Sequence, residues 1–168
     1  GFGVQYEVIV SSTGAKTIKS TFAKDGKAIS IYNVHLDSDV GGKRKTELAD
    51  VLNNAYPDGI VVNHKPIIVG DWNSDLDVSV VQGLLRKKGV RDLIAELGPK
   101  TETHPFTSKY NDNPIYRCIT NFAGGADVRA TASSVFTVTA PTEPLRVAAN
   151  FSACGSDHYI CQAIFSIV

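Results

Sequence analysis

The segment PIIVGDWNSD, residues 66–75, contains a short apolar run that stops abruptly at a glycine. Residues 67–69 predict a buried β-strand that ends at Gly70. Asp71 and Asn73 follow this strand directly, separated by a tryptophan. Polar side chains at the end of a rigid core strand are typical of binding and catalytic loops, although a plain turn has the same composition.

The segments on either side of this strand have the periodicity of amphipathic helices. Residues 42–56 place apolar side chains at helical spacing, at Leu48, Val51, Leu52 and Ala55. Residues 77–97 repeat the pattern before Gly89, at Val80, Val81, Leu84 and Leu85. The order helix, strand, helix predicts an α/β layered fold.

Strands are predicted towards both ends of the chain. Residues 6–36 read as two or three strands, punctuated by Gly14 and by the hairpin turn Asp25-Gly26. Residues 133–140 and 159–168 also read as strands, whereas the region after Pro99 is rich in turn formers. No repeat divides the sequence, so residues 1–168 are expected to form a single domain.

Composition limits the possible function classes. Apolar residues make up 43% of the chain, and no apolar run approaches the roughly 18 residues of a membrane span. Lys+Arg and Asp+Glu both number 17, so no overall field attracts a polyanion, which would have to be bound locally. The sequence opens without an initiator methionine or a signal-peptide pattern, which favours a processed or excised segment.

The three cysteines do not have the spacing of a metal site. A bridge between Cys154 and Cys161 fits an exported protein, but two buried thiols are preferred, and the state of Cys118 is left open. Asn150 begins a glycosylation sequon, which matters only for a secreted eukaryotic protein. The cellular compartment is therefore left open, with secretion as one option.

Two further strand ends carry polar side chains. Residues 29–38, ISIYNVHLDS, alternate apolar and polar positions and deliver His35 at the far end of a strand. Asp157 and His158 come immediately before the last strand. Each motif alone is common, but Asn-x-His-Leu, Gly-Asp-x-Asn and Ser-Asp-His follow one another in order, each joined to a predicted strand.

This ordered set resembles the endonuclease/exonuclease/phosphatase superfamily, which has the deoxyribonuclease-I-like fold. The resemblance rests on residues 33–36, 70–73 and 156–158, and GVRDL at 89–93 is similar as well. It implies an α/β fold in which a two-sheet sandwich is flanked by helices and the active site lies where strand-end loops converge. It also implies metal-assisted hydrolysis of a phosphodiester or phosphomonoester.

The resemblance implies a role for each motif residue. His158 would be the base that activates water, beside a polarising carboxylate, and Asp71 would orient the nucleophile. Asn73 would donate its amide hydrogens to a phosphoryl oxygen, and His35 would be a cation or proton donor beside the phosphate. Asp157 would help to hold a divalent metal, foremost Mg²⁺, with Mn²⁺ or Ca²⁺ as alternatives.

The sequence departs from the family pattern in two places. The family's opening strand with its Asn, and the Gln-Glu pair that supplies the principal metal ligand, are absent, so the chain is expected to lack roughly the first third of the fold. Gln5 and Glu7 lie on the wrong strand to replace that pair. Where the family has an Asp before Ser-Asp-His, this chain has Ser133-Ser134, which leaves the charge partner of the histidine open, with Asp127 as one candidate.

An incomplete sandwich leaves a sheet edge and an apolar face uncovered. We therefore expect a partner chain, a second copy, or an N-terminal segment to complete it.

Three functions are compatible with these motifs. A nuclease that hydrolyses nucleic-acid phosphodiesters is preferred. A phospholipid or phosphoinositide phosphodiesterase or phosphatase is the second, since the motifs specify phosphate and not the attached alcohol. A non-catalytic binding or assembly module is the third, because the Glu ligand is missing. The basic run at residues 43–45 fits a nucleic-acid contact, but it is more often a solvated helix start.

Overall fold

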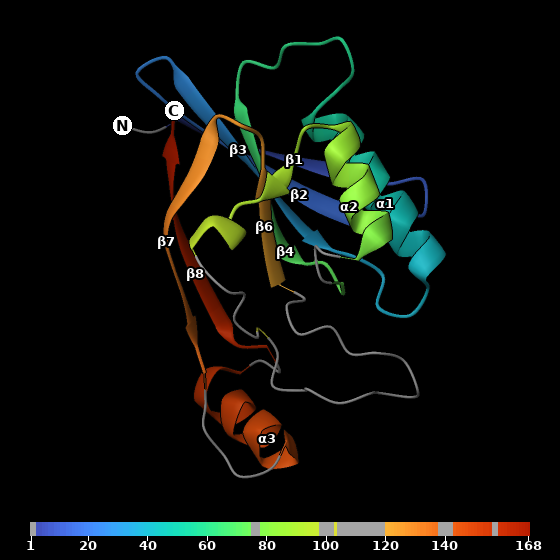
Figure 1. Cartoon of the computed structure of the whole chain (residues 1–168), viewed down its shortest axis with the longest axis vertical. Coiled ribbons are helices and arrows are strands. Elements are labelled where there is room, and N and C mark those ends of the chain that lie inside the picture. Colours follow the sequence, from blue (N-terminus) through green and yellow to red (C-terminus); the bar gives the residue numbers. More distant parts are fainter. Residues whose placement is uncertain (1–2, 75–77, 98–102, 104–119, 138–142, 156–157) are drawn as a thin grey trace.

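The computed structural model describes residues 3–74, 78–97, 103, 120–137, 143–155 and 158–168. Within them lie two β-sheets and three α-helices (Figure 1). The strands are β1 (Gly3–Val10), β2 (Lys16–Lys24), β3 (Lys27–His35), β4 (Lys65–Asp71), β5 (Arg91–Asp92), β6 (Thr120–Gly124), β7 (Val128–Phe136) and β8 (Ile160–Ile167). The helices are α1 (Gly41–Ala55), α2 (Ser79–Lys87) and α3 (Glu143–Cys154), and Ala95–Leu97 forms a short 3₁₀ turn.

The larger sheet has six strands in the order β1-β2-β3-β4-β6-β5. β3 and β4 are its parallel pair, and α1 lies between them in the chain. The hairpin predicted at Asp25-Gly26 is confirmed: β2 and β3 pair antiparallel, and both turn residues have positive φ, as a tight hairpin turn requires. The parallel pairing brings the carboxyl ends of β3 and β4 to the same edge of the sheet.

Helices α1 and α2 cover one face of this sheet (Figure 1). The apolar stripe predicted for α1 is confirmed, because Leu48, Val51, Leu52 and Ala55 are all buried. The prediction for α2 is partly wrong: Val81 and Leu85 are buried, but Val80 is 49% exposed. A helix of nine residues presents only one narrow row to the sheet, and Val80 lies beside that row.

The opposite face of the larger sheet packs on the two-stranded sheet of β7 and β8. Ile67 from β4 and Val128 from β7 belong to one buried cluster, with Phe122 and Phe165 packed against it at a ring-centroid distance of 5.8 Å. The order of layers is therefore helices, six-stranded sheet, two-stranded sheet, with α3 beyond the far end of β7 and β8 (Figure 1). The predicted α/β two-sheet sandwich with flanking helices is confirmed.

The elements that the sequence did not predict include β6 and α3. β6 lies in the turn-rich region, and α3 precedes the Ser-Asp-His motif. β6 contains the buried Asn121, whose Nδ2 is satisfied by donating a hydrogen bond to the Ser74 carbonyl at 2.7 Å. A buried polar side chain satisfied from elsewhere in the chain breaks the apolar pattern that marks a core strand.

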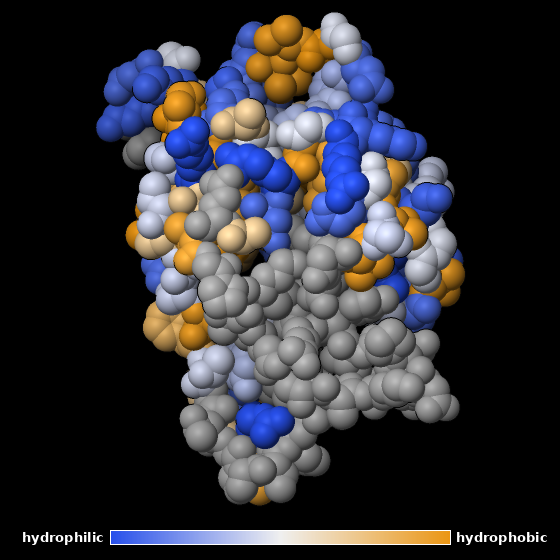
Figure 2. Space-filling model, viewed as in Figure 1, coloured by the Kyte–Doolittle hydropathy of each residue, from blue (hydrophilic) through white to orange (hydrophobic). Residues whose placement is uncertain are grey.

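The helix-free face of β1 and β2 is apolar and exposed. Alternate residues of β1 and one residue of β2 form it, with exposures of 41% for Val4, 75% for Tyr6, 60% for Val8, 60% for Val10 and 49% for Ile18. A second apolar patch lies over the loop between α1 and β4, at the top of Figure 2, where Ile60 and Val61 are exposed. Uncovered apolar surface of this kind accords with the expectation that a further segment completes the sandwich, which stays a prediction.

None of the helices in the described ranges is both long enough and apolar enough to cross a lipid bilayer.

Candidate functional site

The candidate site begins where β3 and β4 end side by side. The parallel register places His35 opposite Asp71, and the Leu36 amide donates a hydrogen bond to the Asp71 carbonyl at 2.9 Å. Both side chains therefore emerge at one edge of the sheet, on the face away from α1 and α2. The two strand ends predicted to carry site residues are adjacent.

Gly70 makes this adjacency possible. Its φ of 124° lies outside the range that L side chains favour, and a Cβ placed on it would lie 2.2 Å from the Val34 carbonyl oxygen. The backbone of β3 thus occupies the space that a side chain would need. The glycine of the Gly-Asp-Trp-Asn motif is required by the close approach of the two strands.

Asn73 is held in place from two sides. Its backbone amide donates to Asp71 Oδ1 at 2.8 Å, and its side-chain Nδ2 donates to the Leu36 carbonyl at 2.7 Å. Its φ of 46° is left-handed, a conformation that asparagine tolerates better than most residues. One amide hydrogen of Asn73 is used by this anchor, which fixes the orientation of the side-chain amide.

Trp72 anchors the loop from the opposite direction. The side chain is fully buried in the core beneath α1 and α2. Trp72 therefore points into the core, whereas its neighbours Asp71 and Asn73 lie at the sheet edge. The buried side chain fixes the orientation of the loop.

Two imidazoles flank the carboxylate of Asp71. Its Oδ2 lies 3.6 Å from Nε2 of His35 and 3.4 Å from Nε2 of His158. The His35 side chain is 77% exposed, whereas the side chains of His158 and Asp71 are 25% and 19% exposed. One imidazole is thus sheltered beside the carboxylate, and a second faces solvent.

Asn150 holds the backbone of His158, a role that sequence reasoning missed. The side chain of Asn150 is 2% exposed, and its Nδ2 donates to the His158 carbonyl at 2.8 Å. The sequence marks this residue only as the start of a sequon, and its burial on α3 leaves no room for a glycan in the folded chain. Thr103 contributes a second link, because its carbonyl accepts a hydrogen bond from Tyr159 N at 3.1 Å.

Asp127 is not the charge partner of His158. Its carboxylate pairs with Lys65 at the start of β4, whereas Asp71 stands at the end of the same strand. The hydrogen bond from Lys65 holds the pKa of Asp127 below its usual value. The carboxylate beside His158 is that of Asp71.

Some of the remaining residues considered from the sequence lie outside the described part of the chain, and Glu7 forms an ion pair far from Asp71. Asp157 lies outside the described residues, as do Ser156 and Cys118. Glu7 pairs with Lys19 at 3.0 Å on the helix-covered side of the sheet, away from Asp71. In the described part of the chain, no three His, Cys, Asp or Glu side chains gather as a metal site.

The basic run at the start of α1 is largely a structural feature. Arg44 donates from Nη1 to the carbonyls of Asp37 and Ser38, the latter at 3.1 Å, which ties α1 to the loop after β3. Lys43 and Lys45 are exposed. Two flanking lysines remain available near the His35 end of β3, and the arginine is engaged by the protein itself.

Cys154 and Cys161 are half-buried thiols with no bridge between them, as preferred from the sequence. Cys154 Sγ donates to the Asn150 carbonyl at 3.2 Å, and Cys161 Sγ donates to the Tyr159 carbonyl at 3.4 Å. Burial raises the pKa of Cys161 to about 11, so its thiol is protonated at neutral pH. A protonated thiol is a poor nucleophile, which argues against a catalytic role for Cys161.

Several solved structures have the same fold as this chain. D. rerio TDP2 complexed with single-strand DNA product has a TM-score of 0.66 at 19% identity, covering 97% of this chain and 68% of that chain. An endonuclease/exonuclease/phosphatase family protein from Leptotrichia buccalis has a TM-score of 0.61 at 14% identity, covering 99% and 61%. The mannosyl-6-phosphatase Bt3783 of Bacteroides thetaiotaomicron has a TM-score of 0.59 at 14% identity, covering 99% and 66%.

These likenesses confirm the fold predicted from the three motifs. The chain spans about two thirds of the length of the structures that it matches. No protein-family model matches the sequence, and no curated protein matches it significantly. The fold is that of endonuclease/exonuclease/phosphatase proteins, and the activity has to be argued from the site.

Proposed function

We propose that this chain carries the hydrolytic site of a phosphodiesterase, and that its substrate is a nucleic acid. The observation that carries the proposal is the position of the Asp71 carboxylate between two imidazoles, 3.6 Å from His35 and 3.4 Å from His158. A carboxylate with a sheltered histidine and an exposed histidine supplies a base and an acid within one site.

In the proposed reaction, water attacks the phosphorus atom and gives its proton to His158. Asp71 lies beside the imidazolium that forms, stabilises its charge and fixes the direction of the attacking water. The bond between phosphorus and the leaving alcohol breaks, and His35 donates the proton that the leaving alkoxide needs. The exposure of His35 fits a residue that meets a large substrate.

Asn73 is proposed to stabilise charge on the phosphoryl oxygen. The hydrogen bond to the Leu36 carbonyl holds the amide in one orientation before substrate arrives. A donor oriented in advance contributes most in the transition state, where negative charge on the oxygens grows. No part of this step needs movement of the loop.

A divalent cation, foremost Mg²⁺, is part of the proposal, with Asp157 as one ligand. The described residues do not fit a metal by themselves, because Asp71 is flanked by two histidines and they offer no second acidic side chain beside it. Among acidic side chains near this edge, Glu47 is buried and already accepts hydrogen bonds from Asp37 N and Thr13 Oγ1. The proposed proton transfers therefore use only His158, Asp71 and His35.

A nucleic-acid substrate is preferred over a lipid for one reason. TDP2, which has the same fold, was solved with a single-strand DNA product. The same fold also occurs in a mannosyl-6-phosphatase, which supports a phosphomonoester or other non-nucleic substrate as the second candidate. A non-catalytic module is the third, because the chain spans only about two thirds of those structures.

The test is a substrate panel assayed with the wild-type chain and with His158→Ala as the blank. Plasmid DNA, single-stranded oligonucleotides, phosphoinositide-containing vesicles and a sugar phosphate are each incubated with and without Mg²⁺. The proposal expects cleavage of nucleic acid that the blank lacks. Turnover only of vesicles or the sugar phosphate would replace the substrate assignment, and equal rates for wild type and blank on every substrate would refute a hydrolytic site at His158.

A further inference from the structure

We propose that two copies of this chain associate through β1, forming one continuous antiparallel sheet across a twofold axis at Tyr6. β1 is the terminal strand of the six-stranded sheet, and no strand among the described residues lies on its outer side. Its eight residues pair with β2 without a register shift. A long, regular edge strand presents a row of backbone donors and acceptors that another strand can satisfy.

The residues of β1 do not protect this edge. The strand contains no proline, its pairing with β2 contains no bulge, and Glu7 is its one charged residue. Edge strands that must stay unpaired usually carry such interruptions or several charges. β1 is therefore suited to pairing with a further strand.

The alternation of side chains selects a register between the copies. In an antiparallel pair, residues directly opposite lie on the same face, so a twofold axis opposes residues of equal parity. An axis at Tyr6 sets Gln5 opposite Glu7 of the second copy and Val4 opposite Val8 of the second copy. An axis at Glu7 would oppose two carboxylates, which is unfavourable.

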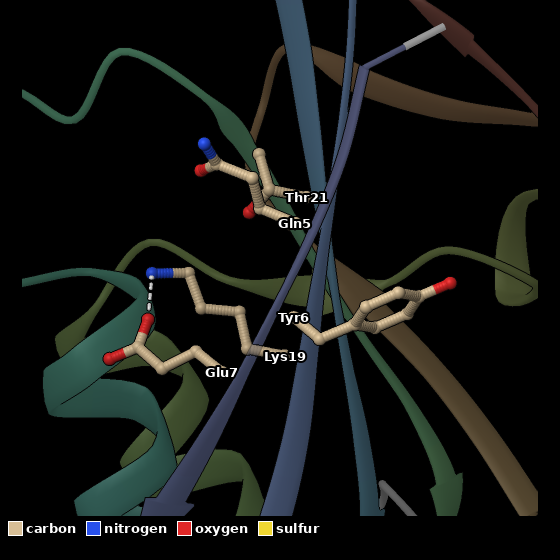
Figure 3. Close-up of a pocket in the computed structure, with 5 residues that line it drawn as sticks. All are labelled: Gln5, Tyr6, Glu7, Lys19 and Thr21. Carbon is tan, nitrogen blue, oxygen red and sulfur yellow. Dashed lines mark hydrogen bonds and ion pairs between the residues drawn. The ribbon is translucent and has the colours of Figure 1, made fainter.

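Both faces of β1 favour the axis at Tyr6. Figure 3 shows Tyr6 on one side of the β1 ribbon and the side chains of Gln5, Glu7, Lys19 and Thr21 on the other. On the polar side these residues line a hollow of about 390 Å³, into which the amide of Gln5 from the second copy would bring a donor for Glu7. On the apolar side Tyr6, 75% exposed, would stack against its symmetry mate.

This inference does not rest on the proposed reaction. The site at Asp71 lies at β4, separated from β1 by β2 and β3. A twofold axis at β1 would leave both copies of the site accessible. The pairing extends the sheet sideways, so it also leaves the apolar face of β1 and β2 for a segment that completes the sandwich.

Sedimentation equilibrium of the 168-residue chain over a range of concentrations tests the proposal. Wild type should show a monomer–dimer equilibrium. Tyr6→Lys and Tyr6→Glu should each weaken association by at least about tenfold, because each places like charges directly opposite at the axis. An equimolar mixture of the two variants should associate again, since a lysine then faces a glutamate.

The matched control is Val61→Lys, which adds the same charge at a residue 92% exposed on the loop between α1 and β4. It should associate as wild type does. Circular dichroism reports whether each variant folds. Because Tyr6 is exposed, we expect both Tyr6 variants to fold. A wild type that is monomeric throughout, a dimer unaffected by Tyr6→Lys, or a mixture that fails to associate would overturn the twofold axis at Tyr6.

Discussion

The Nε2 atom of His158 lies 3.4 Å from the Oδ2 atom of Asp71, although the two residues are far apart in the sequence. The contact joins the end of β4 to the residue that precedes Tyr159 and β8. It forms because the two-stranded sheet packs against the β4 and β6 side of the larger sheet.

Asp71→Asn and His158→Ala should each lower kcat by at least about 10²-fold. His158→Ala removes the proposed base, and Asp71→Asn removes the negative charge that stabilises the imidazolium. Since the two residues act together, the double variant should be little slower than either single variant. Steady-state kinetics on the substrate that the panel identifies measures the three rates. Rate losses that multiply in the double variant would mean that the residues act independently.

Asn150→Ala should lower stability and slow turnover through His158. Losing the buried hydrogen bond to the His158 carbonyl should cost about 1–3 kcal/mol of the free energy of unfolding. If Asn150 positions His158, kcat should fall with KM nearly unchanged. Both constants are measured at a temperature at which the variant is still folded. Phe151→Ala, at a neighbouring residue 60% exposed on α3, is the control and should change neither quantity. If the Asn150→Ala variant has the kcat of wild type, Asn150 contributes to stability only and does not position His158 for catalysis.

Gly70→Ala should be among the most destabilising alanine substitutions in the chain. The new Cβ would lie 2.2 Å from a backbone oxygen of β3 in addition to the strained φ, so a loss above about 3 kcal/mol is expected. Gly14→Ala is the matched control, because Gly14 also has a positive φ but a Cβ added there would meet no atom within 4 Å. It should lose only about 1–2 kcal/mol. Urea denaturation gives both values, and equal losses would show that the clash is relieved by movement.

Stability should fall as the pH drops below 6.5, in part because of His64. Burial, with a smaller contribution from the charge of Lys19, lowers the pKa of His64 from its ordinary 6.5, and its Nε2 has no hydrogen-bond partner among the described residues. The unfolded chain then binds a proton that the folded chain does not, so stability is full above pH 6.5 and is lost as the pH falls towards the lowered pKa. Urea denaturation from about pH 8 to about pH 5 should show a smaller loss for His64→Gln, and an equal loss in both proteins would contradict the shift.

Mg²⁺ should bind the 168-residue chain weakly. The described residues gather no cluster of three metal-binding side chains, and Asp157 alone is a poor site for an ion that prefers several oxygen ligands. Isothermal titration should therefore give a dissociation constant on the order of millimolar or weaker. Asp157→Ala should weaken binding further. Tight binding that survives this substitution would place the metal elsewhere.

The amino-acid sequence alone was enough to locate the polar strand ends. Alternating apolar residues predicted β3, a continuous apolar run predicted β4, and the ends of the two strands carry His35 and Asp71. Helical spacing in residues 42–56 fixed α1, the connection that allows β3 and β4 to run parallel. Local patterns succeed here because strands and helices bury one face, and burial imposes a period on neighbouring residues.

Packing in three dimensions was needed to establish which of these groups act on one another. Sequence order offered Asp127 as a partner for His158, but Asp127 stands at the opposite end of β4, paired with Lys65. It also gave no sign that Asn150 holds the His158 carbonyl. Contacts of this kind depend on how sheets and helices pack, and a single polar side chain that is satisfied by a distant backbone group leaves no periodic trace in the sequence.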